Sequence, residues 1–130
     1  MTMDPRTAAA AYRMASIENA PPIKIVRMLY LGALRYLDNA AKEDPENPES
    51  RFLYWLGRTD AIVTELRLAI DKSQGGDVVE NLEKLYIYCE DEIGKAGLER
   101  STDRIAGIRR VLEVLLDAWQ HVEIDEAQVA

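Results

Sequence analysis

The sequence is short of the side chains on which disulfide bonding, metal binding and acid–base catalysis most depend. Of its 130 residues, one is a cysteine and one is a histidine. A single cysteine excludes an internal disulfide framework, and Cys89 suits a reducing compartment as a small apolar residue on an expected helix face. A single histidine excludes histidine-rich metal sites and leaves little acid–base chemistry near neutral pH.

The surroundings of that histidine, His121, do not favour a catalytic or metal-binding role. Glu113 and Asp117 precede it at helical spacings of four, so a surface ligand set is geometrically possible, but a solvated helix face explains the three residues better. A phosphotransfer role is disfavoured because Glu123 and Glu126 lie nearby and would repel a phosphate. No phosphate-binding loop, nucleophile elbow or Cys-x-x-Cys pair occurs. We therefore expect no enzyme activity, no cofactor and no metal.

Positive charge and long apolar runs are also scarce. Lys and Arg number 16 against 23 Asp and Glu, which gives a net charge of -7. This balance argues against nucleic acid or an anionic membrane as the main partner, because both require a concentrated positive surface. No apolar run approaches the roughly 20 residues of a membrane span, and Asp4 stands where a signal peptide needs positive charge. The sequence predicts a cytoplasmic protein without membrane insertion.

The length and composition fit one domain with its own core, since 48% of residues are hydrophobic and 30% are charged. Residues 1–20 are rich in alanine and lack a sustained apolar stripe, so we interpret them as a mobile arm. Residues 21–123 carry the helical pattern. Residues 124–130 are interpreted as a frayed acidic tail.

Two helices are expected in the first half of the chain. Pro21 and Pro22 favour a helix start, and the first helix is expected over residues 22–42. Asn47 is the expected cap and Pro48 the first residue of a second helix, over residues 48–72. Each helix carries two adjoining apolar stripes. These are Val26, Leu29, Ala33, Tyr36 and Ala40 beside Tyr30, Leu34, Leu37 and Ala41, and then Leu53, Leu56, Val63, Leu66 and Ile70 beside Phe52, Trp55, Ile62 and Ala69.

Two more helices are expected in the second half. Asp77 and Glu80 form a capping-box pattern after two glycines, so a third helix is expected over residues 78–96, with Gly97 as its left-handed cap. A fourth follows Ser101 or Thr102. Their stripes are Val79, Leu82, Tyr86, Cys89, Ile93 and Ala96, and then Ile105, Ile108, Leu112, Leu115, Trp119 and Val122. Short connections between four such helices predict an all-α, antiparallel up-down-up-down four-helix bundle.

The first three helices carry more apolar surface than one core stripe requires. Leu85, Ile87 and Tyr88 widen the face of the third helix in the same way. A row of large apolar side chains left in water would reduce solubility, so a partner segment, a second copy or the arm is expected to cover it. The alternative is that wide stripes simply build a thick core.

The chain resembles the flagellin-specific export chaperones of the FliS family over nearly its whole length. No single residue carries the likeness, but the order and spacing of several do. These are Tyr12 in the Ala-rich arm, Pro22, Met28-Leu29-Tyr30, Gly32-Ala33-Leu34, the Gly75-Gly76-Asp77 loop, Asn81-Leu82, Leu85-Tyr86, Tyr88, Ala96 and Ala118-Trp119. Where the family commonly has a polar or acidic residue, this chain has Leu31, which adds apolar surface to the first helix.

The resemblance implies a chaperone that binds the disordered C-terminal segment of flagellin, prevents its premature polymerisation and delivers it to the flagellar type III export apparatus. Export-gate components are candidate further partners, and a monomer or weak homodimer is expected. Transferred by position, the resemblance places Tyr12 over the client groove and assigns client contact to Met28, Tyr30, Leu82 and Tyr86. Interior packing is the alternative for Leu82. For the whole protein, the alternative is a non-catalytic bundle that forms a structural homo-oligomer.

Overall fold

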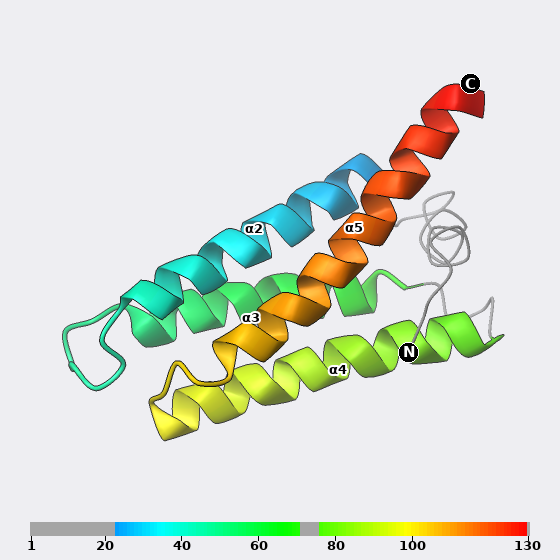
Figure 1. Cartoon of the computed structure of the whole chain (residues 1–130). Coiled ribbons are helices and arrows are strands. Elements are labelled where there is room, and N and C mark those ends of the chain that lie inside the picture. The colour runs from blue at the N-terminus through cyan, green and yellow to red at the C-terminus, as the bar shows by residue number, and fades with distance from the viewer. Residues whose placement is uncertain (1–22, 71–75, 130) are drawn as a thin grey trace.

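The fold is seen in a computed structural model, which describes the backbone of residues 23–70 and 76–129 and the side chains of residues 24–70 and 76–118. Within these ranges it contains four helices: α2 (Ile23–Lys42), α3 (Phe52–Leu68), α4 (Gly76–Glu99) and α5 (Ile105–Val129). Each helix runs antiparallel to the one before it, as Figure 1 shows. The expected all-α four-helix bundle is confirmed. The N-terminal arm, with Tyr12, lies outside the described residues.

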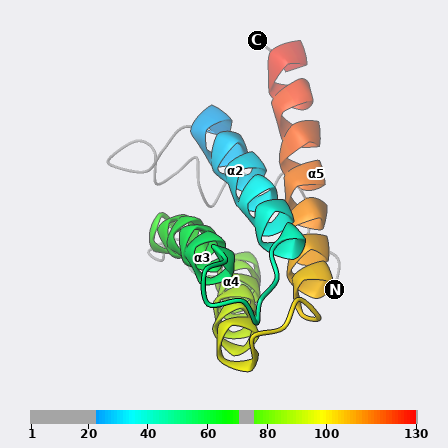
Figure 2. The ribbon, with the colours of Figure 1, turned by 90° about the vertical axis from the view of Figure 1, so that its left-hand side faces the viewer.

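The helices are arranged in a ring in which α2 contacts α3 and α5, and α4 contacts α3 and α5. Packing is more extensive between α2 and α5 than between α4 and α5. The end-on view in Figure 2 shows that the C-terminal turns of α5 rise beyond the other helices. The helix continues to Val129, past the point near residue 123 where the sequence pattern ended.

The core is built from one face of each helix. The stripes predicted for α4 and for α5 as far as Leu115 are confirmed, because every one of those residues is buried. On α2 the two predicted stripes are buried together except for half-buried Leu29 and Tyr36 and exposed Ala41. A wide stripe is needed because α2 packs against two neighbouring helices. For this helix, the thick-core alternative is correct.

The start of α3 differs from the sequence prediction. Asn47 does not cap a helix beginning at Pro48. Its Oδ1 accepts the backbone N–H of Glu49 at 2.9 Å, which closes a local turn instead, and α3 begins at Phe52. Asparagine side chains commonly compete with helix formation in this way. The result is a loop of residues 43–51 between α2 and α3.

The end of α4 also differs. Gly97 lies inside the helix, and the left-handed residue is Arg100, with φ of 50°. The N–H of Ser101 bonds the carbonyl of Ala96 at 3.3 Å, which is the pattern of a Schellman cap. A Cβ on Gly97 would lie 3.5 Å from Leu53 of α3. This is an ordinary van der Waals distance, so the packing at Gly97 does not require a glycine, and Gly97 does not cap the helix.

Two arginines tie α5 to its neighbours. Arg109 donates to Asp38 of α2 at 2.7 Å and to the Leu34 carbonyl at 3.3 Å. Arg104 bonds Glu92 and Glu99 of α4 at distances of 2.9–3.0 Å. Both pairs are partly exposed, so each contributes modestly to stability while fixing the position of α5.

Candidate functional site

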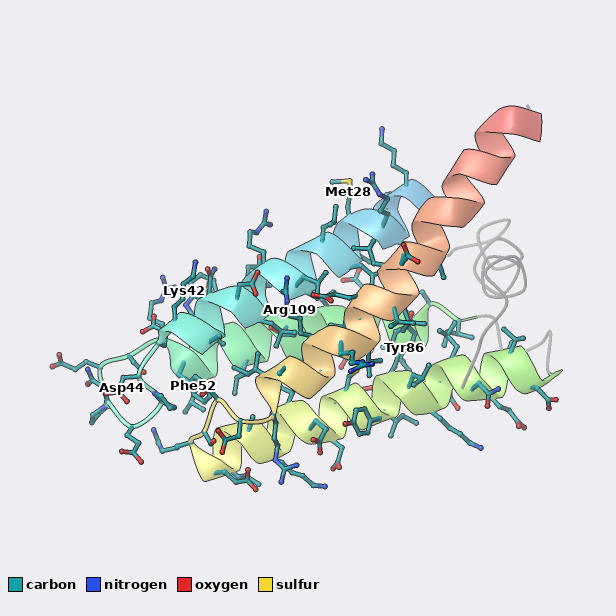
Figure 3. All side chains as sticks on the ribbon, in the orientation of Figure 1. Met28, Lys42, Asp44, Phe52, Tyr86 and Arg109 are labelled. Atoms are coloured by element: carbon teal, nitrogen blue, oxygen red, sulfur yellow. The ribbon has the colours of Figure 1, made fainter. Side chains whose placement is uncertain are left out.

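Of the four described residues assigned to client contact, one lies on the outer surface of the bundle and three lie in its core. Met28 is 61% exposed on the outer surface of α2, and its side chain points away from the bundle in Figure 3. Tyr30, Leu82 and Tyr86 have 0% exposure and belong to the core. Tyr12 lies outside the described residues, so its position over a groove stays a prediction. Only Met28 of the described four is placed where a partner could touch it directly.

The two buried tyrosines join α2 to α4 across the centre of the bundle. Their ring centroids are 6.5 Å apart, and the hydroxyl groups of Tyr30 and Tyr86 hydrogen-bond to each other. A buried phenol needs such a partner because its hydroxyl loses its hydrogen bonds to water on folding. The pair therefore fixes the inner face of α2, and with it the direction in which the outer face points.

An apolar row runs along the outer face of α2. It consists of Ile25, Met28 and Leu31, which are 44%, 61% and 42% exposed. Their spacing of three residues keeps them on one side of the helix. We refer to these three residues as the outer row of α2. The sequence pattern assigned none of them to a stripe, although the resemblance marked Met28, and the departure at Leu31 was the signal that this surface is unusually apolar.

A second apolar surface lies between the start of α3 and the end of α4. This groove has a volume of about 520 Å3. Its apolar lining includes Leu53, Ile93 and Leu98, and a Cβ on Gly57 or Gly94 would meet nothing within 4 Å. The absent side chains keep the groove open. The sequence analysis missed it because glycines inside helical patterns carry no hydrophobic periodicity.

The edge of this groove is charged. Glu90 accepts a hydrogen bond from Thr64 at 3.1 Å and is held by Arg67 through two further contacts. Burial, followed by the negative charge of Glu90, raises the pKa of Asp60, and the charge of Arg67 acts in the opposite direction. A partner in this groove would therefore meet an apolar floor and a charged rim, in which Asp60 and the ion-paired Glu90 lie together with Arg100.

The part of the chain that the structure describes gives no arrangement for catalysis. Among those residues no group of three or more His, Cys, Asp or Glu side chains could hold a metal ion. Cys89 is buried, and burial, followed by the charges of Glu90 and Glu92, raises the pKa of its thiol to about 12. Such a thiol is not a nucleophile near neutral pH. None of the described helices has the length and apolarity to cross a bilayer.

Comparison with known proteins agrees with this geometry. The family described as "Flagellar protein FliS" matches residues 5–126. The flagellar secretion chaperone FliS of Campylobacter jejuni is 34% identical over 118 residues, covering 91% of each chain. The FliS of Vibrio cholerae is 27% identical over 90% of this chain and 89% of its own. FliSB of Pseudomonas aeruginosa is 28% identical over 83% and 86%.

The match extends from the arm to the C-terminal turns of α5, so it covers the bundle as a whole rather than one motif. The family consists of chaperones and not of enzymes, which accords with the buried, unreactive thiol and the apolar outer surfaces. The chain belongs to the FliS family of flagellar secretion chaperones.

Proposed function

We propose that this protein is a cytoplasmic chaperone that binds the C-terminal segment of flagellin, keeps it from polymerising early and presents it to the flagellar export apparatus. Three relatives are named as flagellar secretion chaperones, which supports a client of the flagellar export system. The export-gate components belong to the same proposal as later partners. A client segment that is disordered alone can fold on the chaperone, because burial of its apolar face offsets the cost of ordering it.

The observation that carries the proposal is the outer row of α2. Its three side chains are exposed on a helix whose opposite face is already filled by the core, so folding of the bundle does not require them to be apolar. An amphipathic client helix with apolar residues at spacings of three and four could pack along this row. Full burial of such side chains is worth about 1.5–3 kcal/mol each, and roughly half remains available because the row is about half exposed.

The groove between α3 and α4 extends the apolar surface available to a client. An extended segment that leaves the outer row could reach it by wrapping around α3. Tyr30, Leu82 and Tyr86 act from within the bundle in this proposal, because they hold α2 and α4 in place without touching the client.

Tyr12 remains the proposed cover of the client groove. If the arm is a removable cover, deletion of residues 1–20 leaves the bundle folded and tightens client binding or leaves it unchanged. Circular dichroism and a titration with the client peptide measure both effects. Loss of the fold on this deletion would contradict the role of a removable cover.

The experiment compares two substitutions with matched exposure. Met28 on α2 is 61% exposed and Val114 on α5 is 63% exposed. We expect Met28→Ser to weaken binding of a flagellin C-terminal peptide about tenfold, a change of about 1.4 kcal/mol, and Val114→Ser to leave it unchanged. Both variants should keep the thermal midpoint of the parent within a few degrees. Equal affinities for the two variants would remove the outer row from the binding surface.

A structural homo-oligomer is not favoured, because the family to which the chain belongs is one of chaperones. In a homo-oligomer the outer row would be buried against a second copy. Light scattering of the free protein distinguishes the two, and we expect a monomer or a weak homodimer.

A further inference from the structure

Three arginines and three aromatic rings gather where the second half of α2 packs against the first half of α3. Figure 3 labels Lys42 at the end of α2 and Phe52 at the start of α3. Within a chain of net charge -7, this concentration of positive charge is unexpected. We call it the arginine–aromatic patch. It consists of Arg35 and Tyr36 on α2 and of Arg51, Tyr54, Trp55 and Arg58 at the start of α3.

The rings form one continuous surface. Tyr36 stacks on Trp55 with centroids 5.6 Å apart and an interplanar angle of 23°. Tyr54 meets the edge of Trp55 at 4.9 Å and 75°. Tyr54 is 48% exposed, so the surface is open to a partner. Aromatic residues and arginine are the side chains most enriched at the energetic centres of protein interfaces.

Each arginine lies over a ring. The Cζ of Arg51 is 4.2 Å from the Tyr54 centroid and 4.9 Å from the Trp55 centroid. Arg58 and Arg35 lie 5.5 Å and 5.9 Å from the Tyr36 centroid. All three guanidinium groups are within the roughly 6 Å range of cation–π attraction. Stacking restricts their motion and leaves their N–H edges available for an anion.

None of the three arginines forms an ion pair with a carboxylate in the described part of the chain. Other arginines are neutralised, including Arg67 by Glu90, and Arg109 by Asp38 and Glu113. Arg58 also donates a long hydrogen bond of 3.5 Å to the Tyr36 hydroxyl. That bond and the charge of Arg58 lower the pKa of Tyr36, as expected beside an uncompensated cation.

The start of α3 adds to this positive field. Its first turn contains no acidic residue, and the N-cap residue Arg51 makes no side-chain cap hydrogen bond. The partial positive charge of a helix N-terminus therefore coincides with the arginines rather than being neutralised by a carboxylate.

We propose that the arginine–aromatic patch docks a short acidic peptide segment that contains an aromatic residue, contributed by a partner protein other than the flagellin client. Carboxylates fit the planar guanidinium edges, and an aromatic side chain fits the exposed rings. A long polyanion such as nucleic acid does not fit, because the loop just before Arg51 carries carboxylates at Glu43, Asp44, Glu46 and Glu49. The patch shares no residue with the outer row of α2, although Arg35 follows Leu31 by one helical turn. The inference goes beyond the proposed function because it assigns this surface to a second partner.

The probe is a blocked peptide of alternating glutamate and phenylalanine, titrated into the full-length protein and followed by calorimetry and two-dimensional NMR. We expect binding that weakens with added salt, with shifts concentrated on the Arg35, Arg51 and Arg58 side chains and the Trp55 indole. A peptide with glutamine in place of glutamate should bind at least about tenfold more weakly. Equal binding of the glutamine peptide, shifts on another face, or tighter binding of single-stranded DNA would overturn the proposal.

Variants give an independent test. Arg51→Gln combined with Arg58→Gln should weaken the acidic peptide about tenfold or more. The control is Lys84→Gln combined with Arg110→Gln, which removes two exposed positive charges from α4 and α5 and should leave the affinity within about twofold. Arg58→Lys keeps the charge but loses the planar edge, so it should also weaken binding. Equal weakening by both double variants would show a general charge effect and overturn the docking site.

Discussion

Replacement of Tyr30 and Tyr86 by phenylalanine, singly and together, tests how the bundle holds α2. Both side chains are fully buried, and their hydroxyl groups bond to each other across the core. A single substitution removes this bond and takes one partner from the other hydroxyl, which costs about 1–3 kcal/mol. In the double variant both hydroxyl groups are absent, so neither is left in the core without the other. The double variant should therefore be more stable than the sum of the single effects predicts, with a coupling free energy of about 1 kcal/mol.

The assay is equilibrium urea unfolding followed by circular dichroism, with the thermal midpoint as a second measure. For a chain of this size, 1 kcal/mol corresponds to roughly 4 °C. Tyr88→Phe is the matched control, since Tyr88 is 45% exposed on α4 and should change stability little. Strictly additive effects of Tyr30→Phe and Tyr86→Phe would show that the two hydroxyl groups do not stabilise each other in solution.

Three further predictions follow from the described contacts. Leu82→Ala should lower the free energy of unfolding by about 2–5 kcal/mol, because Leu82 is fully buried; a loss below 1 kcal/mol in urea unfolding would place it outside the core. Cys89 should react with a thiol reagent only as fast as the protein unfolds, since burial raises the pKa of its thiol to about 12; rapid labelling of the native protein would contradict this. The hydrogen bond from Arg104 lowers the pKa of Glu99, so the Glu99 carboxylate contributes stability above its unfolded pKa and loses it as pH falls through the lower folded value. Glu99→Gln should therefore reduce the acid sensitivity of the thermal midpoint, and an unchanged pH profile would count against the pair.

The helical period predicted the interior of α4 and α5 because each presents a single stripe to the core. On α2 the period also placed Tyr30 in an apolar stripe and Met28 in none, and the two lie about 200° apart at roughly 100° per residue. The resemblance nevertheless assigned both to client contact, and the structure places only Met28 on the surface. The resemblance transfers positions along the chain and does not say which side chain faces the core.

Two of the predicted helix boundaries were wrong, at the start of α3 and at the end of α4. Asn47 forms a turn with Glu49 although its position resembles a helix cap. Gly97 resembles a C-cap, but α4 continues through it to Glu99, and Arg100 takes the left-handed conformation instead. In both cases a residue type that commonly caps helices takes another role, and the sequence pattern does not distinguish the two roles.

In the proposed function, this bundle folds a flagellin segment onto its apolar surface. A calorimetric titration of the unaltered protein with a peptide from the C-terminal region of a flagellin of the same cell, repeated at several temperatures, tests this proposal. We expect a one-to-one complex, a negative heat-capacity change and a gain in helicity by circular dichroism. Absence of binding at high micromolar concentration, together with a stable dimer by light scattering, would contradict it.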